Sequence, residues 1–400
     1  MDQRTGLPVV TMIGGGQLAR MTHQAAIALG QSLRVLATGP GEPVALVAPD
    51  VVLGEHTDLD ALRRAAAGAE AVTFDHEHVP GEHLRALVAD GVNVHPGPDA
   101  LLHAQDKLVM RRRLADLGEP VPPFAAVDGV DDVTAFAAQH GWPVVLKAVR
   151  GGYDGRGVWV LDDADAAGTT VPELLAAGTP LMVEQKVALR RELAAVLARS
   201  PFGQAAVWPV VETVQEQGIC TEVLAPAPGL DPERAEEAEE LALRVAAALG
   251  VVGLLAVELF ETDGADGQGG LVVNELAMRP HNSAHWTIEG SVTSQFEQHL
   301  RAVLDYPLGS TATTAPVTVM ANVLGGDPVP ATGVDERLHH TLARFPEARV
   351  HLYGKAERPG RKVGHVTVRG DDLDDVRTRA RLAADHLSTG VWSDGWDPHQ

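Results

Sequence analysis

Apolar and polar positions alternate with a period of two in two runs just past the middle of the chain. The runs cover residues 254–260 and 271–277, and each contains one acid, Glu258 in the first and Glu275 in the second. Residues 263–270 between them are rich in glycine, as in a turn that closes a hairpin. The pattern therefore predicts two antiparallel strands with one carboxylate on each.

The two acids are expected to lie together among aliphatic side chains. Residues two apart share a face of a strand, so Glu275 lies with Val273 and Ala277. Glu258 lies with Ala256 in the same way. Bare carboxylates are costly there, and Mg²⁺ is usually held by one or two carboxylates together with substrate phosphates. The pair predicts a site for Mg²⁺ or Mn²⁺; the alternative is two strand-edge acids that face water.

Several polar groups follow directly after the second of these strands. Arg279 supplies a cation, Asn282 supplies donors, and His281 and His285 supply groups for acid–base chemistry. Beside a metal and phosphate site, they predict an adjoining anion pocket.

The chain opens with the pattern of a βαβ unit. A strand is predicted over residues 8–13, a helix over 17–29 from its apolar spacing, and a second strand over 33–37. The turn between the first two, Gly14 to Gly16, nearly matches the dinucleotide fingerprint, which holds phosphate on helix N–H groups. The second strand lacks the terminal acid that binds the ribose of NAD. The phosphate of another ligand is therefore at least as good a candidate.

Two acids end the strand that is predicted over residues 71–79. Asp75 and Glu77 are two positions apart, so they are expected to point the same way. They are either site residues or ordinary exposed acids at a strand end.

Beyond the N-terminal unit a helix is predicted over residues 104–117, ending at Gly118. It contains the run Arg111-Arg-Arg113. Neighbouring residues of a helix point about 100° apart, so a solvated face is the expected position of this run.

A glycine-rich hairpin follows the helix. Residues 142–147 are predicted to form a strand that ends at Lys147, and residues 158–161 form the next strand. The connection, residues 151–157, contains four glycines, more than a structural turn needs. Its backbone can approach phosphates, and Lys147 and Arg156 add positive charge.

Two further strands are predicted to carry acids, residues 181–187 with Glu184 and a strand through residue 197 with Glu192. Residues 310–316 are expected to be a linker or loop.

Composition narrows the class of protein. The chain has 400 residues and is 45% hydrophobic, enough for two or three domains with large cores. Its 54 acids and 32 bases give a formal net charge of −22, which argues against nucleic acid or an anionic membrane as a partner. A single cysteine, Cys220, fits a reducing cytoplasm. No signal peptide is predicted, and the longest apolar stretch is too short to span a bilayer.

Lysine is scarce in this chain. Only five of the 32 basic residues are lysines, at positions 107, 147, 186, 355 and 362. Arginine evidently serves at positions where any surface charge is sufficient. The few lysines are therefore expected at positions that need a compact ammonium group. Chance survival is the alternative, and we expect Lys186 to be incidental.

Taken together, these motifs resemble the ATP-grasp superfamily, and within it the 5-(carboxyamino)imidazole ribonucleotide synthases of purine biosynthesis. The resemblance covers almost the whole chain. The stretches that carry it, in order, are residues 14–21, 151–157, 274–286, 294–297 and 358–365.

The resemblance implies an α/β protein, with α+β character in its central part. It implies an ATP-grasp fold with an N-terminal Rossmann-like βαβ domain (1–104) and a small C-terminal β-rich domain (306–400). The ATP-grasp domain (105–305) would contain a lid at about 105–190 and a metal and phosphate subdomain at about 191–305. A homodimer is expected.

The implied activity is that of an ATP-dependent carbon–nitrogen ligase. Such enzymes use ATP and bicarbonate to carboxylate the exocyclic amine of 5-aminoimidazole ribonucleotide, through carboxyphosphate, and release ADP and phosphate.

Roles carried over from the family fall into four groups. Glu258 and Glu275 hold Mg²⁺, and Arg279, His281 and Asn282 hold bicarbonate and stabilise developing charge. The residues implied to contact ATP are His103, Lys107, Lys147, Gly152, Tyr153, Asp154, Gly155, Arg156, Gly157, Glu184, Gln185, Lys186, Val187, Glu192, Gln215, Asn274 and Glu275. Those implied to contact the ribonucleotide are Glu77, Tyr153, Asp154, Arg156, Lys355, Arg361 and Lys362, the last three as a basic cluster for the 5′-phosphate.

The sequence departs from its relatives at several positions. Many ATP-grasp enzymes have asparagine where Ala277 stands, which argues against peptide-type ligases and biotin carboxylase. Asp75 stands where the family often has glutamate, and His103 and Gln215 stand where relatives have arginine and histidine.

Three rival functions remain at this point. One is another ATP-grasp ligase acting on a purine precursor, such as a formate-dependent glycinamide ribonucleotide transformylase. An NAD-dependent oxidoreductase would leave residues 147–286 unexplained. A non-catalytic nucleotide sensor would have no need of the metal acids and Arg279.

Overall fold

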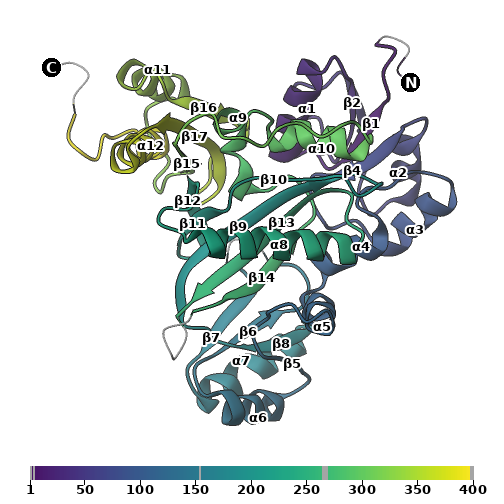
Figure 1. Ribbon diagram of the computed structural model, residues 1–400, viewed down its shortest axis with the longest axis vertical. Helices are drawn as coiled ribbons and strands as arrows, with labels where there is room; N and C mark the ends of the chain where they lie inside the picture. The colour runs from purple at the N-terminus through teal and green to yellow at the C-terminus, as the bar shows by residue number, and fades with distance from the viewer. Residues whose placement is uncertain (1, 3–4, 153–154, 264–268, 397–400) are drawn as a thin grey trace.

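The computed structural model describes residues 2, 5–152, 155–263 and 269–396. Its strands form three sheets (Figure 1). A parallel N-terminal sheet lies at the upper right, a long antiparallel sheet runs through the centre, and a small antiparallel sheet lies at the bottom. No described helix is long and apolar enough to cross a membrane.

The N-terminal sheet has the order β3-β2-β1-β4. Its elements are β1 (Val10–Ile13), α1 (Gln17–Ala28), β2 (Leu33–Ala37), β3 (Asp50–Leu53), α2 (Leu59–Ala66), β4 (Ala71–Phe74) and α3 (Gly81–Ala89). The predicted βαβ opening is confirmed, because β1 and β2 pair in parallel on either side of α1. Strand β4 is shorter than predicted, so Asp75 and Glu77 lie in the loop that follows it.

The helix predicted over residues 104–117 is in fact two helices, α4 (Pro98–Gln105) and α5 (Lys107–Asp116). They are separated by Asp106, whose extended backbone lets its side chain accept a hydrogen bond from the N–H of Val109 at 2.9 Å. The N–H of Lys107 donates to the carbonyl of Val149 at 2.9 Å. The break therefore places Lys107 at the start of α5, beside the glycine-rich hairpin.

The sheet at the bottom of Figure 1 has the order β5-β8-β6-β7. Its strands are β5 (Phe124–Val127), β6 (Val144–Ala148), β7 (Val158–Leu161) and β8 (Leu181–Gln185), and its helices are α6 (Val130–His140) and α7 (Ala164–Ala176). The antiparallel pairing of β6 with β7 confirms the predicted hairpin. The helices pack on the face that carries Leu146 and Val183, so Lys147 and Glu184 lie on the opposite face.

The central sheet has the order β14-β13-β9-β11-β12-β15-β17-β16, with β10 (Ala205–Val207) beside β9. Its strands are β9 (Leu189–Arg199), β11 (Val211–Glu216), β12 (Ile219–Ala225), β13 (Gly253–Thr262), β14 (Leu271–Ala277), β15 (Val317–Leu324), β16 (Arg349–Leu352) and β17 (Lys362–Gly370). Its helices are α8 (Pro232–Ala248), the short η1 (Asn282–Ala284) and α9 (Thr287–Gly290), α10 (Gln295–Val303), α11 (Val334–Arg344) and α12 (Leu373–Thr389). The C-terminal strands thus extend the sheet that carries the acids.

Strands β13 and β14 pair as predicted, but with one irregularity. Glu258 is opposite Glu275, whereas the next residue of β13, Leu259, is opposite Val273. Asn274 is therefore an extra residue in β14, a bulge. Val273 packs in the same core cluster as Leu276. The prediction that Glu275 shares a face with Val273 is wrong, because the bulge reverses the alternation there.

Candidate active site

The acid pair is the centre of the candidate site, and two basic side chains contact it. The Nζ of Lys107 lies 2.9 Å from Oε1 of Glu275, and Nε2 of His281 lies 3.2 Å from Oε1 of Glu258. Burial alone would raise the pKa of Glu258. The hydrogen bond and charge of His281, with the charge of Lys362, outweigh burial and lower this pKa. The carboxylate is therefore ionised at neutral pH.

A buried group of three charged side chains lies between α5 and the lower sheet. The Glu184 carboxylate receives Nε of Arg111 at 2.5 Å and Nζ of Lys147 at 2.7 Å. The three side chains are 1%, 3% and 10% exposed for Arg111, Glu184 and Lys147. Burial acts to raise the pKa of Glu184, but the two cations lower it. The expectation that the run from Arg111 is solvated holds for Arg112 and Arg113 and is wrong for Arg111.

This buried group also holds the bulge in β14. Nζ of Lys147 lies 3.2 Å from Oδ1 of Asn274, and Nη2 of Arg111 donates to the Asn274 carbonyl at 2.7 Å. Both oxygens of Glu184 are engaged by these cations, and the contact with ATP that the resemblance implies for Glu184 stays a prediction. The observed contacts fix Lys147 next to the strand that carries Glu275.

The glycines of the connection between β6 and β7 have a left-handed backbone. The four glycines of residues 151–157 have φ between +73° and +83°. A Cβ added to Gly152 would lie 2.4 Å from the carbonyl oxygen of Arg156. Only glycine allows so close an approach, which leaves backbone groups accessible to a ligand. Tyr153 and Asp154 lie outside the described residues.

Glu192, on β9, lies close to the acid pair. It is opposite Thr213 in the sheet and is hydrogen-bonded to Gln215. Burial, followed by the negative charge of Glu258, raises the pKa of Glu192 to about 7. The contacts with ATP that the resemblance implies for Glu192 and Gln215 stay predictions. His103 lies on α4, where its Nδ1 is 3.2 Å from the carbonyl of residue 100.

The open face of the lower sheet carries two apolar residues that the sequence analysis did not select. Val158 and Val160 are 39% and 50% exposed, while Trp159 between them packs toward the helices. Lys147 is opposite Val158 and shares its face. An apolar surface beside a lysine that is predicted to bind phosphate suits a purine base. The alternation in 158–160 was the signal that could have identified it. Strand β8 ends nearby at Gln185, before the exposed Lys186 and the half-buried Val187.

The anion pocket predicted after β14 is held by neighbouring elements. Nε of Arg279 lies 3.3 Å from Glu77, and the other oxygen of Glu77 accepts the N–H of Met278 at 2.8 Å. Asn282 exchanges two hydrogen bonds with Asn322 of β15, at 3.0 and 2.8 Å. Asn322 was not selected from the sequence, although one amide in an apolar strand is a signal. The acid, the cation and the amide pair thus bring three regions of the chain together.

His285 does not fit the acid–base role predicted for it. His285 is 1% exposed, and burial holds the pKa of its imidazole well below the ordinary range. It is therefore a neutral side chain in the core, and that prediction is wrong.

Asp75 occupies the N-terminus of α1. Its carboxylate accepts hydrogen bonds from the N–H groups of Gly16 at 2.9 Å and Ala19 at 2.7 Å. A Cβ on Gly16 would lie 2.3 Å from this carboxylate. An internal carboxylate thus already binds these two N–H groups, so they are not the ones that would hold the predicted phosphate. Asp75 and Glu77 also have different partners, contrary to the expected common direction.

A cavity of about 420 Å³ brings the glycine turn next to the C-terminal basic segment. Gln17, Lys355 and Arg361 line it, and Nζ of Lys355 donates to Oε1 of Gln17. Lys362 does not line this cavity; its charge acts on Glu258 instead. The predicted cluster of three basic residues is thus divided between the cavity and the acid pair.

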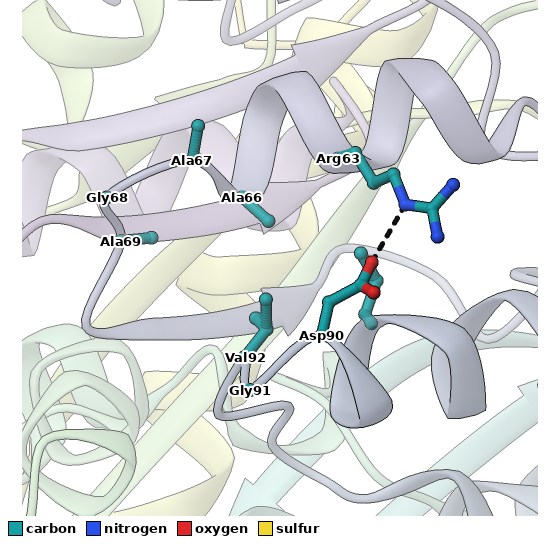
Figure 2. Close-up of a pocket in the computed structure, with 9 residues that line it drawn as sticks. Arg63, Ala66, Ala67, Gly68, Ala69, Asp90, Gly91 and Val92 are labelled. Carbon is teal, nitrogen blue, oxygen red and sulfur yellow. Dashed lines mark hydrogen bonds and ion pairs between the residues drawn. The ribbon is translucent and has the colours of Figure 1, made fainter.

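A second cavity, of about 400 Å³, lies on the N-terminal unit (Figure 2). Its only described ion pair joins Nε of Arg63 to Asp90 at 2.8 Å, with both side chains nearly half exposed. The described residues that line it include none of the predicted site residues. It is therefore not part of the candidate site.

Family models match three stretches of the chain. Residues 7–105 match the ribonucleotide synthetase preATP-grasp domain, residues 112–296 the ATP-grasp domain, and residues 318–379 the phosphoribosylaminoimidazole carboxylase C-terminal domain. These stretches cover most of the chain in the order that the resemblance implies.

Curated relatives and solved structures agree with these matches. The N5-carboxyaminoimidazole ribonucleotide synthase of Mycobacterium tuberculosis is 64% identical over 393 residues, 98% of this chain and 91% of the relative. That of Corynebacterium ammoniagenes is 53% identical over 98% of this chain and 94% of the relative. The structure of the synthetase from Thermus thermophilus has a TM-score of 0.83 and 38% identity over 97% of this chain and 100% of that one. The Aspergillus clavatus synthase in complex with ADP and 5-aminoimidazole ribonucleotide has a TM-score of 0.84 and 30% identity over 95% and 98%.

Proposed function

The chain belongs to the N5-carboxyaminoimidazole ribonucleotide synthase family of ATP-grasp ligases, and on this premise we propose how its residues divide the reaction. The enzyme carboxylates the exocyclic amine of 5-aminoimidazole ribonucleotide with ATP and bicarbonate, a step of purine biosynthesis. The formate-dependent transformylase is not favoured, because the relatives are synthases of this one kind. The observation that carries the residue assignment is the register that sets Glu258 directly opposite Glu275.

We propose that Glu258 and Glu275 hold Mg²⁺ or Mn²⁺. Two adjacent carboxylates suit a hard cation whose other ligands are substrate phosphates. Among the described residues, no cluster of three or more His, Cys, Asp or Glu offers an all-protein cage for a metal, which fits this kind of shared site. A metal bound there would neutralise charge on the transferred phosphoryl group.

The phosphate chain of ATP is assigned to the lysines and the glycine-rich loop. Lys147 is fixed by Glu184 and Asn274, so its ammonium group is positioned before a ligand arrives. The Nζ of Lys107 lies 2.9 Å from Glu275, where it can contact the phosphates that the metal binds. The adenine would pack on the open face of the lower sheet, against Val160.

Bicarbonate is assigned to the pocket formed by Arg279, His281 and Asn282. Its oxygen attacks the γ-phosphorus, ADP leaves, and carboxyphosphate forms. Arg279 is fixed by Glu77 and can stabilise negative charge as it develops on the carboxyl group. The amine nitrogen of the ribonucleotide then bonds to the carboxyl carbon. The bond from this carbon to the phosphate oxygen breaks, phosphate leaves, and the nitrogen loses one proton.

The ribonucleotide is assigned to the cavity between the N-terminal and C-terminal segments. Lys355 and Arg361 line it and would bind the 5′-phosphate. Glu77 contacts Arg279, and the charge of Lys362 acts on Glu258, so both are assigned to the end of the ribonucleotide where the amine must reach the carboxyl group. We also propose the domain boundaries given by the resemblance, a homodimer, and a cytoplasmic location.

A phosphate-release assay with ATP and Mg²⁺ tests the function. Release should require both bicarbonate and 5-aminoimidazole ribonucleotide, and formate with glycinamide ribonucleotide should not replace them. Phosphate release that follows formate instead would support the transformylase. A protein that binds ATP without turnover under any of these conditions would support a sensor.

A further inference from the structure

Gln295, the first residue of α10, is a fully buried amide whose polar atoms are all engaged. Its side chain is within the core at 0% exposure. Its Oε1 accepts the N–H of His281 at 2.7 Å, and its Nε2 donates to the carbonyl of the same residue at 2.8 Å. One side chain thus binds both backbone groups of His281, as a neighbouring strand would.

The same amide determines the state of a second histidine. Nε2 of Gln295 lies 2.8 Å from Nδ1 of His285. An amide nitrogen only donates, so Nδ1 of His285 must accept and its proton must be on Nε2. The two N–H groups of the amide are then both used, one on His281 and one on His285.

This arrangement fixes the position of His281. Its Nδ1 lies 2.8 Å from Oγ of Ser283, and its Nε2 lies 3.2 Å from Glu258. Ser283 orients the imidazole of His281. Among the described side chains, only Gln295 binds the backbone of His281. A change at Gln295 would therefore move the imidazole relative to the acid pair.

We infer that Gln295 is a positioning residue for the bicarbonate pocket, acting on the reaction through the backbone of His281. This inference rests on the proposed function, because it takes His281 to contact the reacting carboxyl group. Gln295 itself touches no substrate. Its role also accounts for the stretch 294–297, which resembles the family and has no other role in the site.

The same helix carries a matched control. Gln298 is also 0% exposed. Its Nε2 donates to the carbonyl of Gly309, and its Oε1 accepts the N–H of Gly309, both at 2.8 Å. This amide makes the same clamp on a backbone, but on a loop that carries no predicted site residue. Glutamine→methionine at either position removes a buried clamp with little change of volume.

The experiment compares Q295M and Q298M with the wild type, measuring kcat, the KM of ATP, and ribonucleotide carboxylated per phosphate released. A displaced reacting group lowers rates steeply, so Q295M should lose about 10- to 100-fold in kcat. Its KM for ATP should stay within about twofold, because uniform binding of ATP is untouched. Less than one ribonucleotide should be carboxylated per phosphate, since a misplaced pocket lets carboxyphosphate hydrolyse. Q298M should keep tight coupling and near-normal kcat, at a similar loss of thermal stability.

Equal effects of Q295M and Q298M, or full coupling in Q295M, would overturn the inference. If Q295M does not fold, Q295E replaces it, because glutamate keeps the acceptor for the His281 N–H and loses the donor. Q295E should show the same loss of coupling, and wild-type coupling in Q295E would overturn the inference as well. Failure of the proposed function is distinguishable, because wild type and Q298M would then release no phosphate in response to bicarbonate and ribonucleotide.

Discussion

Glu184→Gln tests two effects of the buried group formed by Arg111, Lys147 and Glu184. One is its contribution to the stability of the fold, and the other is its effect on the position of Lys147. The substitution keeps the size of the side chain and removes the negative charge that both Arg111 and Lys147 contact. Both cations lie within 2.7 Å of that carboxylate, and both are at most 10% exposed. Water therefore cannot replace the lost partner.

The expected loss of stability follows from this burial. Removing one partner of a buried ion pair costs about 3–5 kcal/mol, because the remaining charge is left uncompensated. For a domain of about 150–250 residues each kcal/mol lowers Tm by about 2–4 °C, so Tm should fall by about 6–20 °C. The KM for ATP should rise about tenfold, because Lys147 loses the contact that fixes its ammonium group.

Thermal unfolding and ATP kinetics of three variants test this reasoning. Asp90→Asn makes the same chemical change in the exposed pair with Arg63, whose contact is 2.8 Å, and should leave Tm close to wild type. The double variant R111M/E184Q removes one cation with the acid and should recover about half of the lost stability. The KM for ATP should stay raised in it, since Lys147 is still released. A Tm for E184Q equal to that of D90N would refute the reasoning.

Three further predictions concern the rest of the site. E258Q and E275Q should each abolish turnover with an unchanged circular dichroism spectrum, and near-normal kcat in both would remove the metal assignment. K355A and R361A should each raise the KM of the ribonucleotide about 10- to 100-fold, because each loses a charge-assisted hydrogen bond worth about 1.5–3 kcal/mol. The KM of ATP should not change. An effect confined to the KM of ATP would place the 5′-phosphate of the ribonucleotide elsewhere. Because the pKa of Glu192 is raised to about 7, above an unfolded value of about 4.3, its ionisation destabilises the fold as pH rises between these values. E192Q should therefore unfold like wild type below pH 4.5 and be more stable at pH 8 by on the order of 1–3 kcal/mol, and equal Tm values at pH 8 would contradict this.

The elements and their pairing could be predicted where local pattern decides them. The hairpin of β13 and β14 and its opposed acids follow from alternation and a glycine-rich turn, and the structure confirms both. The bulge at Asn274 could not be predicted, because it depends on Lys147 and Arg111 reaching across from other elements. Helical periodicity likewise cannot tell which arginine of a run will face a buried acid.

Motif resemblance assigned residues to the candidate site, but it could not predict their partners in the structure. His285 and Asp75 have the residue types of a reactive site, yet one is neutral in the core and the other caps α1. In the sequence, Gln295 stood out only as part of residues 294–297, one of the stretches that resemble the family. Its clamp on His281 depends on where α10 lies, and the sequence contains no local signal for that position.

The single central sheet also determines the order in which the molecule can be completed. Strand β12 gains its second neighbour only when β15 has been synthesised, and β15 gains its own only with β17. These pairings are between segments distant in the chain, which makes them late steps of folding. The strands of the acid pair are made earlier, but they form one end of a sheet whose other end is β16 and β17. A ribosome must therefore release almost the entire chain before this sheet can close its last pairings.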